Sequence, residues 1–185
     1  MNGMINITKP AVFISESEIQ TRVQKIATEI KSFYTNFNLE NDQSLVVVGV
    51  LKGAAIFTSD LIRNINLPIQ LEFVRLASYG DGTKSGVLSA PDLSLPNLRN
   101  RHILIVEDIV DTGKTAVFLK QYLQDQFEPK TLKLASLLNK PSKRQTEVEP
   151  DFVGFEIEDK FVIGYGLDWA EKYRELSYLG IIEEF

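Results

Sequence analysis

Apolar residues recur along this chain with two spacings, one typical of helices and one typical of buried strands. The residues at 19, 23, 26, 30 and 33 are apolar, and intervals of three or four place them on one face of a helix. Ser15 and Glu18 precede this face as a capping box, in which two backbone N–H groups are satisfied reciprocally. We therefore expect a helix that begins after Ser15 and runs to about Tyr34.

Continuous aliphatic runs predict strands that are covered on both faces of a sheet. Such runs, together with one partly alternating run that is rich in β-forming residues, predict strands at 45–50, 69–76, 103–106 and 132–138. Helical patterns follow two of these strands, one opening at Gly53 and running through Ile65, the other covering 116–123. Because strands alternate with helices, we expect an α/β fold in which helices flank a central parallel sheet.

The segments at 78–100 and 150–185 follow neither pattern. The first carries Gly, Ser, Pro and Asp without periodicity, and a loop of that length in a compact domain is typically a functional lid. The second is aromatic and poor in helix signals, so we expect a small hood that shares strands with residues 12–14. No linker separates this hood from the rest. We expect a single domain over 1–185, with the hood at approximately 1–14 and 150–185.

Composition restricts the class of protein. The 185 residues, 44% of them apolar, are enough for one domain with its own core. The chain has no cysteine, which excludes disulfides and thiol chemistry, and no apolar run of about 18 residues that could span a membrane. Its first residues lack the basic and apolar regions of a signal peptide, so we expect a cytoplasmic protein. The formal net charge of -5 argues against a nucleic-acid surface.

The stretch at 103–115 carries the strongest chemical signal. Its aliphatic strand is followed by Glu107 and Asp108, then by Asp111, and then by a Thr-Gly-Lys-Thr turn that opens a helix. A glycine turn at a helix start directs backbone N–H groups and the positive end of the helix dipole at one point. We therefore expect residues 112–115 to bind a phosphate.

The carboxylates beside this turn would repel a bare phosphate, so they need another partner. Sugar hydroxyls or a divalent cation with oxygen ligands fit that role, and the composite suits a phosphorylated sugar. A P-loop is the competing interpretation, because Gly113-Lys114-Thr115 matches the end of its motif. That motif needs a glycine where this chain has Asp108, and an acidic side chain does not allow the same approach of backbone to phosphate. The P-loop interpretation therefore fails.

Residues 106–115 resemble the phosphoribosyl-diphosphate (PRPP) motif of type I phosphoribosyltransferases. Asp111 is similar to the acidic residue of the 6-oxopurine branch, the hypoxanthine-guanine phosphoribosyltransferases. The likeness runs from about Val12 to the C-terminus, and segments at 51–53, 78–79 and 152–168 resemble the pyrophosphate loop, the mobile catalytic loop and the purine-binding hood. It implies a pentosyl glycosyltransferase of purine salvage, which moves 5-phosphoribosyl from PRPP to hypoxanthine, guanine or both and gives IMP or GMP with pyrophosphate.

The resemblance also implies a role for each matching residue. Glu107 and Asp108 resemble the ligands of the ribose, and with Asp168 they are the expected ligands of Mg²⁺. Asp111 would take the proton that the purine ring loses. The other implied roles are 5′-phosphate binding by Thr112, Gly113, Lys114 and Thr115, pyrophosphate binding by Lys52, Gly53 and Arg174, purine binding by Lys140, Phe161, Val162 and Asp168, and a mobile loop that starts at Ser78 and Tyr79.

Some assignments stay open. Lys140 is the expected donor to the purine 6-oxo group, with Lys143 and Arg144 as rivals nearby. The mobile loop at 78–86 departs from the family, because no basic strand follows it, and its length and closure are undecided. His102 precedes the central strand, far from the expected site, and receives no role.

Two other functions share these motifs. A relative could act on another base, such as xanthine or a pyrimidine. A regulatory protein could keep the fold to sense PRPP while binding nucleic acid, but it would need a basic face and could lose Asp111. The acidic chain, with Asp111 present, favours the enzyme. Its implied partners are PRPP and a 6-oxopurine, with no nucleic acid or membrane. Members of the family tend to form dimers or tetramers, so the resemblance also implies a homo-oligomer.

Overall fold

The computed structural model describes residues 10–37, 39, 44–78, 88–89 and 95–182. Its elements are β1 (Ala11–Ile14), α1 (Glu16–Thr35), β2 (Leu45–Leu51), α2 (Ala55–Ile65), β3 (Ile69–Arg75), β4 (Ala77–Ser78), β5 (Leu88–Ser89), β6 (His102–Val110), α3 (Lys114–Phe127), β7 (Thr131–Asn139), the 3₁₀ turn η1 (Pro141–Lys143), β8 (Phe152–Glu156), β9 (Val162–Ile163) and β10 (Leu179–Ile181). Tyr79 and most of the expected lid lie outside the described residues. Within the described part of the chain, no helix has the length and apolar character to cross a membrane.

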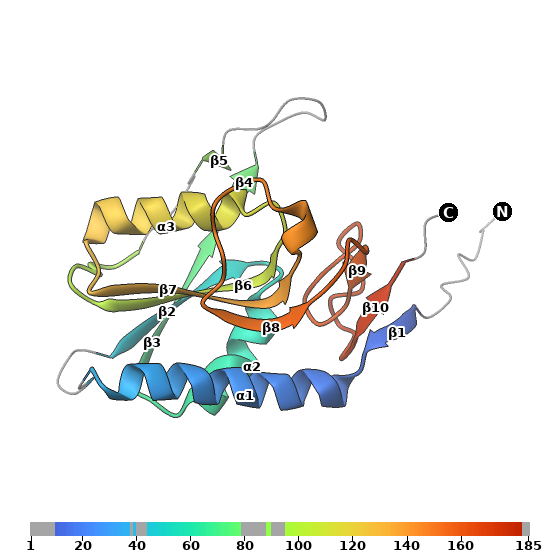
Figure 1. Ribbon diagram of the computed structural model, residues 1–185, viewed down its shortest axis with the longest axis horizontal. Helices are drawn as coiled ribbons and strands as arrows, with labels where there is room; N and C mark the ends of the chain where they lie inside the picture. The colour runs from blue at the N-terminus through green and yellow to red at the C-terminus, as the bar shows by residue number, and fades with distance from the viewer. Residues whose placement is uncertain (1–9, 38, 40–43, 79–87, 90–94, 183–185) are drawn as a thin grey trace.

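The central sheet is parallel, with strands in the order β3-β2-β6-β7-β8. Figure 1 shows α1 and α2 on one face of this sheet and α3 on the other. Side chains of β2 alternate between the two resulting core layers, with Val47 facing α1 and α2, and Val46 and Val48 facing α3. The expected α/β fold is therefore confirmed, and the carboxyl ends of β2 and β6 meet at one edge of the sheet, where ligands bind in such folds.

Helix α1 forms as its sequence pattern predicts. Ile19, Val23 and Ile30 are completely buried against the sheet side. At the start of the helix, the Ser15 hydroxyl accepts from the Glu18 backbone, and the Glu18 carboxylate accepts from the Ser15 N–H at 2.8 Å. The capping box and the apolar face act together and fix where the helix begins and which side it buries.

The structure differs from the sequence pattern at three places. Strand β6 continues to Val110, so Glu107 and Asp108 lie within the strand and not after it, since its pairing with β7 continues past the aliphatic run. Helix α2 begins at Ala55, because Gly53 belongs to the turn before it. The pair β4–β5 forms antiparallel strands within the segment expected to be irregular.

The hood is a separate antiparallel sheet in the order β1-β10-β9. Ala11 pairs with Ile181, so the N-terminal strand joins the C-terminal segment as expected. The expected lower boundary of the hood, at 150, is wrong for β8, which pairs in parallel with β7 and completes the main sheet. β8 belongs to the main sheet because its Phe152 is buried and packs edge-on against Phe33 of α1, at a distance of 6.2 Å between the ring centroids.

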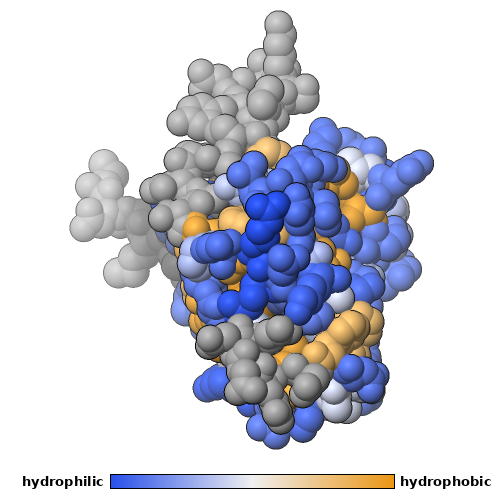
Figure 2. Space-filling view, turned by 90° about the vertical axis from the view of Figure 1, so that its left-hand side faces the viewer, coloured by the Kyte–Doolittle hydropathy of each residue, from blue (hydrophilic) through white to orange (hydrophobic). Residues whose placement is uncertain are grey.

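A buried hydrogen bond fastens the hood to the main body. Tyr165, which has φ = 47° and is almost completely buried, donates from its hydroxyl to Asp60 of α2 at 2.6 Å. Gln20 of α1 donates to the same carboxylate oxygen at 3.2 Å. The hood thus sits over the carboxyl ends of the strands. The opposite end of the molecule is covered mainly by hydrophilic residues, with smaller apolar areas (Figure 2).

Candidate active site

The end of β6 and the start of α3 enclose a turn at 111–113. Gly113 immediately precedes α3 and has φ = 82°, a left-handed conformation that suits glycine. No side chain caps α3 there, and Gly113, Thr115 and Ala116 line a cleft beside the turn. The turn therefore presents backbone donors and the positive end of the helix dipole to the cleft, as a phosphate site requires.

A second segment packs against this turn and determines its shape. The backbone N–H of Gln145 and the hydroxyl of Thr146 donate to the Thr112 carbonyl at 3.0 and 3.1 Å. A Cβ atom on Gly113 would lie 2.3 Å from the Thr146 hydroxyl oxygen and 2.6 Å from a methyl group of Val148. Any other residue at 113 would push this segment away from the turn.

Arg144 continues the same support toward the strand ends. Its guanidinium donates to the backbone carbonyls of Val110 and Asp111 and to the side-chain oxygen of Asn139, at the end of β7. Its side chain is 11% exposed. Arg144 is therefore committed to the backbone of the turn, which removes it as a rival to Lys140 for the purine.

Two acidic side chains line the cleft next to the turn. Glu107 is buried, and its Oε1 atom has no hydrogen-bond partner. Burial, followed by the charges of Asp108 and Asp111, raises the pKa of Glu107 well above its usual value. Burial also raises the pKa of Asp108 to about 6, against the opposing effects of the Ile109 N–H and the Arg174 charge. A buried acceptor without a donor suits a ligand that brings hydroxyl groups.

The turn between β2 and α2 forms the opposite wall. The peptide bond between Leu51 and Lys52 is cis, and Lys52 and Gly53 both line the cleft. A Cβ atom on Gly53 would lie 1.6 Å from Oδ2 of Asp108. Glycine is required here because the Asp108 carboxylate occupies the space of a side chain, and this close approach leaves the backbone accessible from the cleft.

The hood supplies the third wall. Arg174 donates to the Gly166 carbonyl at 2.7 Å and pairs with the Asp168 carboxylate at 2.7 Å. A Cβ atom on Gly166, which has φ = 101°, would lie 2.2 Å from the Gly53 carbonyl oxygen. Glu171 pairs with the Lys52 ammonium at 2.8 Å, and this hydrogen bond is the main cause of the lowered pKa of Glu171. The backbones of hood and body thus meet at the cleft.

These walls enclose a cavity of about 340 Å³. The expected residues that line it are Lys52, Gly53, Glu107, Asp108, Asp111, Gly113, Thr115, Asp168 and Arg174. Thr112 and Lys114 belong to the turn but are not among the lining residues. Ser78 ends β4, and only its backbone is described.

Of the residues expected to bind the purine, Asp168 lines this cavity, whereas Lys140, Phe161 and Val162 do not. Lys140 is buried, and its Nζ donates to the Lys160 carbonyl at 2.6 Å, while its backbone N–H donates to Val110. Phe161 is 52% exposed, and Val162 is buried in β9. Lys143, the rival to Lys140, pairs with Asp159 at 2.5 Å on the surface. Lys140 is thus tied to the end of β6, next to Asp111.

The structure does not gather Glu107, Asp108 and Asp168 into a preformed metal site. Among the described residues, no group of three His, Cys, Asp or Glu side chains could hold a metal ion. The reason is that Asp168 faces Arg174 and also accepts from the Glu171 backbone at 2.8 Å. Mg²⁺ is usually held by one or two carboxylates together with phosphate oxygens and water. The unpartnered oxygen of Glu107 and the neighbouring Asp108 fit that smaller role.

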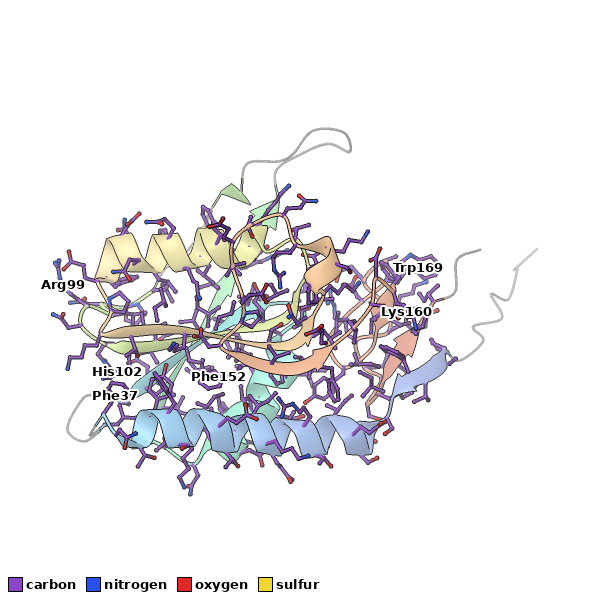
Figure 3. All side chains as sticks on the ribbon, in the orientation of Figure 1. Phe37, Arg99, His102, Phe152, Lys160 and Trp169 are labelled. Carbon is purple, nitrogen blue, oxygen red and sulfur yellow. The ribbon has the colours of Figure 1, made fainter. Side chains whose placement is uncertain are left out.

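The sequence pattern did not predict the contacts that Arg144 and Glu171 make at the site. The contact of Arg144 with the turn and that of Glu171 with Lys52 both join segments far apart in the sequence, and no local motif marks them. His102 was given no role in the sequence analysis. It lies near Phe37 at one end of the sheet, whereas Lys160 and Trp169 of the hood lie at the other end of the molecule (Figure 3).

Comparison with known proteins agrees with this geometry. Residues 17–170 match the model of the phosphoribosyl transferase domain family. The chain is 42% identical to hypoxanthine phosphoribosyltransferase of Haemophilus influenzae, over 94% of this chain and 96% of the relative. It is 41% identical to hypoxanthine-guanine phosphoribosyltransferase of Bacillus subtilis, over 93% and 92% of the two chains.

A solved structure of hypoxanthine phosphoribosyltransferase from Trypanosoma cruzi, in complex with the product IMP, superposes with a TM-score of 0.87. It is 36% identical and covers 93% of each chain. The likeness thus extends over the main sheet and the hood together. This chain belongs to the phosphoribosyl transferase domain family, within its hypoxanthine and hypoxanthine-guanine phosphoribosyltransferases.

Proposed function

We propose that this chain transfers the 5-phosphoribosyl group of PRPP to hypoxanthine or guanine in purine salvage, giving IMP or GMP and pyrophosphate. One observation carries the proposal within the family: a phosphate-binding turn and a buried carboxylate with an unpartnered oxygen share one cleft. A phosphorylated sugar brings both the anion and the hydroxyl groups that these two features need.

The phosphate end of the substrate lies at the start of α3. The backbone N–H groups of residues 113–115 and the hydroxyls of Thr112 and Thr115 hold the 5′-phosphate, and Lys114 adds positive charge at the turn. Glu107 and Asp108 accept from the ribose hydroxyls. Their raised pKa values make ionisation costly in the free protein, so hydroxyl donors stabilise them when substrate binds.

Pyrophosphate departs on the other side of the ribose. The bond from C1 to the diphosphate oxygen breaks with its electron pair on the leaving group, and the sugar develops positive charge before the purine nitrogen bonds to C1. Lys52, Gly53 and Arg174 line this wall and stabilise the negative charge with donors. Glu107 and Asp108 would hold Mg²⁺ together with substrate oxygens, and the ion would supply further neutralisation of the negative charge. Asp168 keeps Arg174 oriented through their 2.7 Å ion pair and has lone pairs left for the metal.

Asp111 handles the proton that the purine loses. It is exposed at the mouth of the turn, and its carboxylate accepts from the Thr112 N–H at 2.5 Å. That hydrogen bond holds one carboxylate oxygen in place and leaves the other available to the purine ring. A carboxylate within reach of the ring nitrogen takes its proton as the new bond forms.

The purine binds beside this cleft, under the hood. Lys140 uses one of its three N–H donors on the Lys160 carbonyl, which leaves donors for the 6-oxo group. The exposed ring of Phe161 offers a face for stacking, and Val162 offers backbone groups to the base edge.

The proposal extends to the protein's setting. We place it in the cytoplasm and expect it to work as a homo-oligomer. For the Trypanosoma cruzi enzyme, a solved structure addresses the role of the C-terminal region in oligomeric state and activity. Size measurement in solution by light scattering distinguishes monomer, dimer and tetramer for this chain.

A panel of bases tests the proposed reaction. The protein is incubated with PRPP, magnesium and one of hypoxanthine, guanine, xanthine or adenine, and nucleotide formation is followed by chromatography. Hypoxanthine and guanine are expected to react, whereas adenine, whose 6-amino group meets the donor-only lysine, is not. EDTA should abolish turnover and magnesium restore it. Equal use of adenine, or full activity without metal, contradicts the proposal.

A further inference from the structure

Glu171 lies at the tip of a tight two-residue turn in the hood. Trp169 and Lys172 exchange backbone hydrogen bonds at 3.1 Å in both directions. The two residues between them, Ala170 and Glu171, have φ = 52° and 62°. Turns of this kind normally carry glycine, asparagine or aspartate, because other side chains are disfavoured at positive φ. The turn thus holds a glutamate in a backbone conformation that glutamate rarely adopts.

The carboxylate of Glu171 points at two cations of the candidate active site. One oxygen, Oε2, lies 2.8 Å from Nζ of Lys52 and 3.4 Å from Nη2 of Arg174. Lys52 comes from the turn after β2 and Arg174 from the hood, so this single oxygen joins the two walls of the cleft. Both cations line the cavity, and both are among the residues proposed to bind pyrophosphate.

These ion pairs add little to the stability of the fold. The side chains of Lys52 and Glu171 are 47% and 66% exposed, and exposed pairs contribute little because water and salt screen them. The hood is already fastened by buried contacts, including the hydrogen bond from Tyr165 to Asp60. Holding the two walls together therefore does not require Glu171, and its position needs another explanation.

We propose that Glu171 is an internal competitor of pyrophosphate, whose carboxylate oxygen takes the place of a diphosphate oxygen between Lys52 and Arg174 in the free protein. The inference rests on the proposed function and adds a determinant of affinity to the same site. An entering diphosphate must displace the Glu171 carboxylate from both cations. The displaced carboxylate stays close to the site, and its negative charge repels the diphosphate. Glu171 therefore weakens the binding of pyrophosphate and of the diphosphate end of PRPP.

The competition has a use in turnover. Pyrophosphate is released after the new bond to the purine forms, and a site with two unopposed cations would retain it. A carboxylate that returns to the same cations assists its departure. Glu171 thus lowers the affinity for PRPP and speeds the release of pyrophosphate.

The test compares Glu171→Gln with Glu175→Gln. Both variants remove one negative charge from the same hood segment, and Glu175 is an exposed residue that serves as the matched control. Glutamine keeps the shape of the side chain at 171. Isothermal titration calorimetry with inorganic pyrophosphate and magnesium gives the dissociation constant of each protein.

Glu171→Gln is expected to bind pyrophosphate roughly three- to ten-fold more tightly than the unmodified protein, the range for an exposed charge. The gain should shrink at high salt, because screening weakens the competition. The KM for PRPP should fall with it while the KM for hypoxanthine stays the same. Glu175→Gln should resemble the unmodified protein in all three measurements.

Three outcomes overturn the inference. Unchanged affinity for pyrophosphate in Glu171→Gln, or a gain equal to that of Glu175→Gln, would show that Glu171 does not compete at the cations. Weaker binding in Glu171→Gln would show that Glu171 positions Lys52 and Arg174 for the ligand. Failure of the proposed function gives a different result, because the unmodified protein would then form no nucleotide from PRPP and hypoxanthine or guanine, whatever its affinity for pyrophosphate.

Discussion

Replacing Arg144 with methionine tests whether the phosphate turn depends on support from outside its own sequence. The change removes the donors to Asp111, Val110 and Asn139 but keeps an apolar stem of similar length. The Val110 carbonyl retains a partner, because it also accepts from the Lys140 N–H at 2.9 Å. The Asp111 carbonyl and the Asn139 side-chain oxygen lose their charged donor.

The size of the effect follows from these two losses. A hydrogen bond to a charged group contributes about 1.5–3 kcal/mol, so with partial replacement by water we expect Arg144→Met to cost about 2–4 kcal/mol of unfolding free energy. For a protein of this size that lowers the Tm by roughly 4–12 °C. Because the turn that holds the 5′-phosphate also loosens, the KM for PRPP should rise several-fold.

Thermal unfolding followed by circular dichroism measures the stability change, and initial rates measure the KM. Lys143→Met is the matched control, since Lys143 makes an exposed pair with Asp159 that adds little to stability because water and salt screen it. If Arg144→Met and Lys143→Met melt at the same temperature, the hydrogen bonds of Arg144 to Val110, Asp111 and Asn139 do not support the turn. If the Tm falls while the KM for PRPP is unchanged, Arg144 stabilises the fold without shaping the phosphate site.

Three further predictions concern the site itself. Asp111→Asn should lower turnover by roughly 10²-fold with little change in PRPP binding, the usual range for a lost proton acceptor; wild-type rates would remove Asp111 from the mechanism. Lys140→Ala should raise the KM for hypoxanthine much more than that for PRPP. If Lys143→Ala raises the KM for hypoxanthine and Lys140→Ala does not, Lys143 is the lysine that contacts the base. The pKa of Asp108 is raised from 3.8 to about 6 on folding, so stability falls as pH rises through that window. Asp108→Asn should therefore stabilise the fold by on the order of 2 kcal/mol at about pH 7.5 and by less at about pH 5, while it impairs activity; an equal Tm gain at both pH values would place the cause elsewhere.

The fold followed from the sequence wherever one pattern decided burial. The apolar face of α1 and the aliphatic run of β2 each gave the correct type of element, because in both cases tertiary packing agrees with local preference. The end of β6 was misplaced since Glu107 and Asp108 interrupt the aliphatic run, although their backbones still pair with β7. At a ligand site, polar residues occupy strand positions that hydrophobicity alone assigns to a loop.

The candidate site divides in the same way. The turn at 111–113 could be predicted, because its acidic residue, its glycine and the start of the next helix are contiguous in the sequence. The contacts of Arg144 and Glu171 could not, since each reaches a segment far away along the chain and neither residue belongs to a local motif. The type of residue does not reveal such contacts either, because the ion pair of the Asp168 carboxylate with Arg174 is seen only in the folded structure.

The pairing of β1 with β10 has a consequence for the order in which the molecule is made. Ala11 pairs with Ile181, and β10 leaves the ribosome only after every strand of the main sheet has been synthesised. The main sheet and the turn at 111–113 can assemble from segments that are close in the nascent chain. β1, in contrast, can pair with β10 only when synthesis of the chain is almost complete. Premature termination before β10 would therefore leave a chain that keeps this turn but lacks the β1-β10-β9 sheet of the hood.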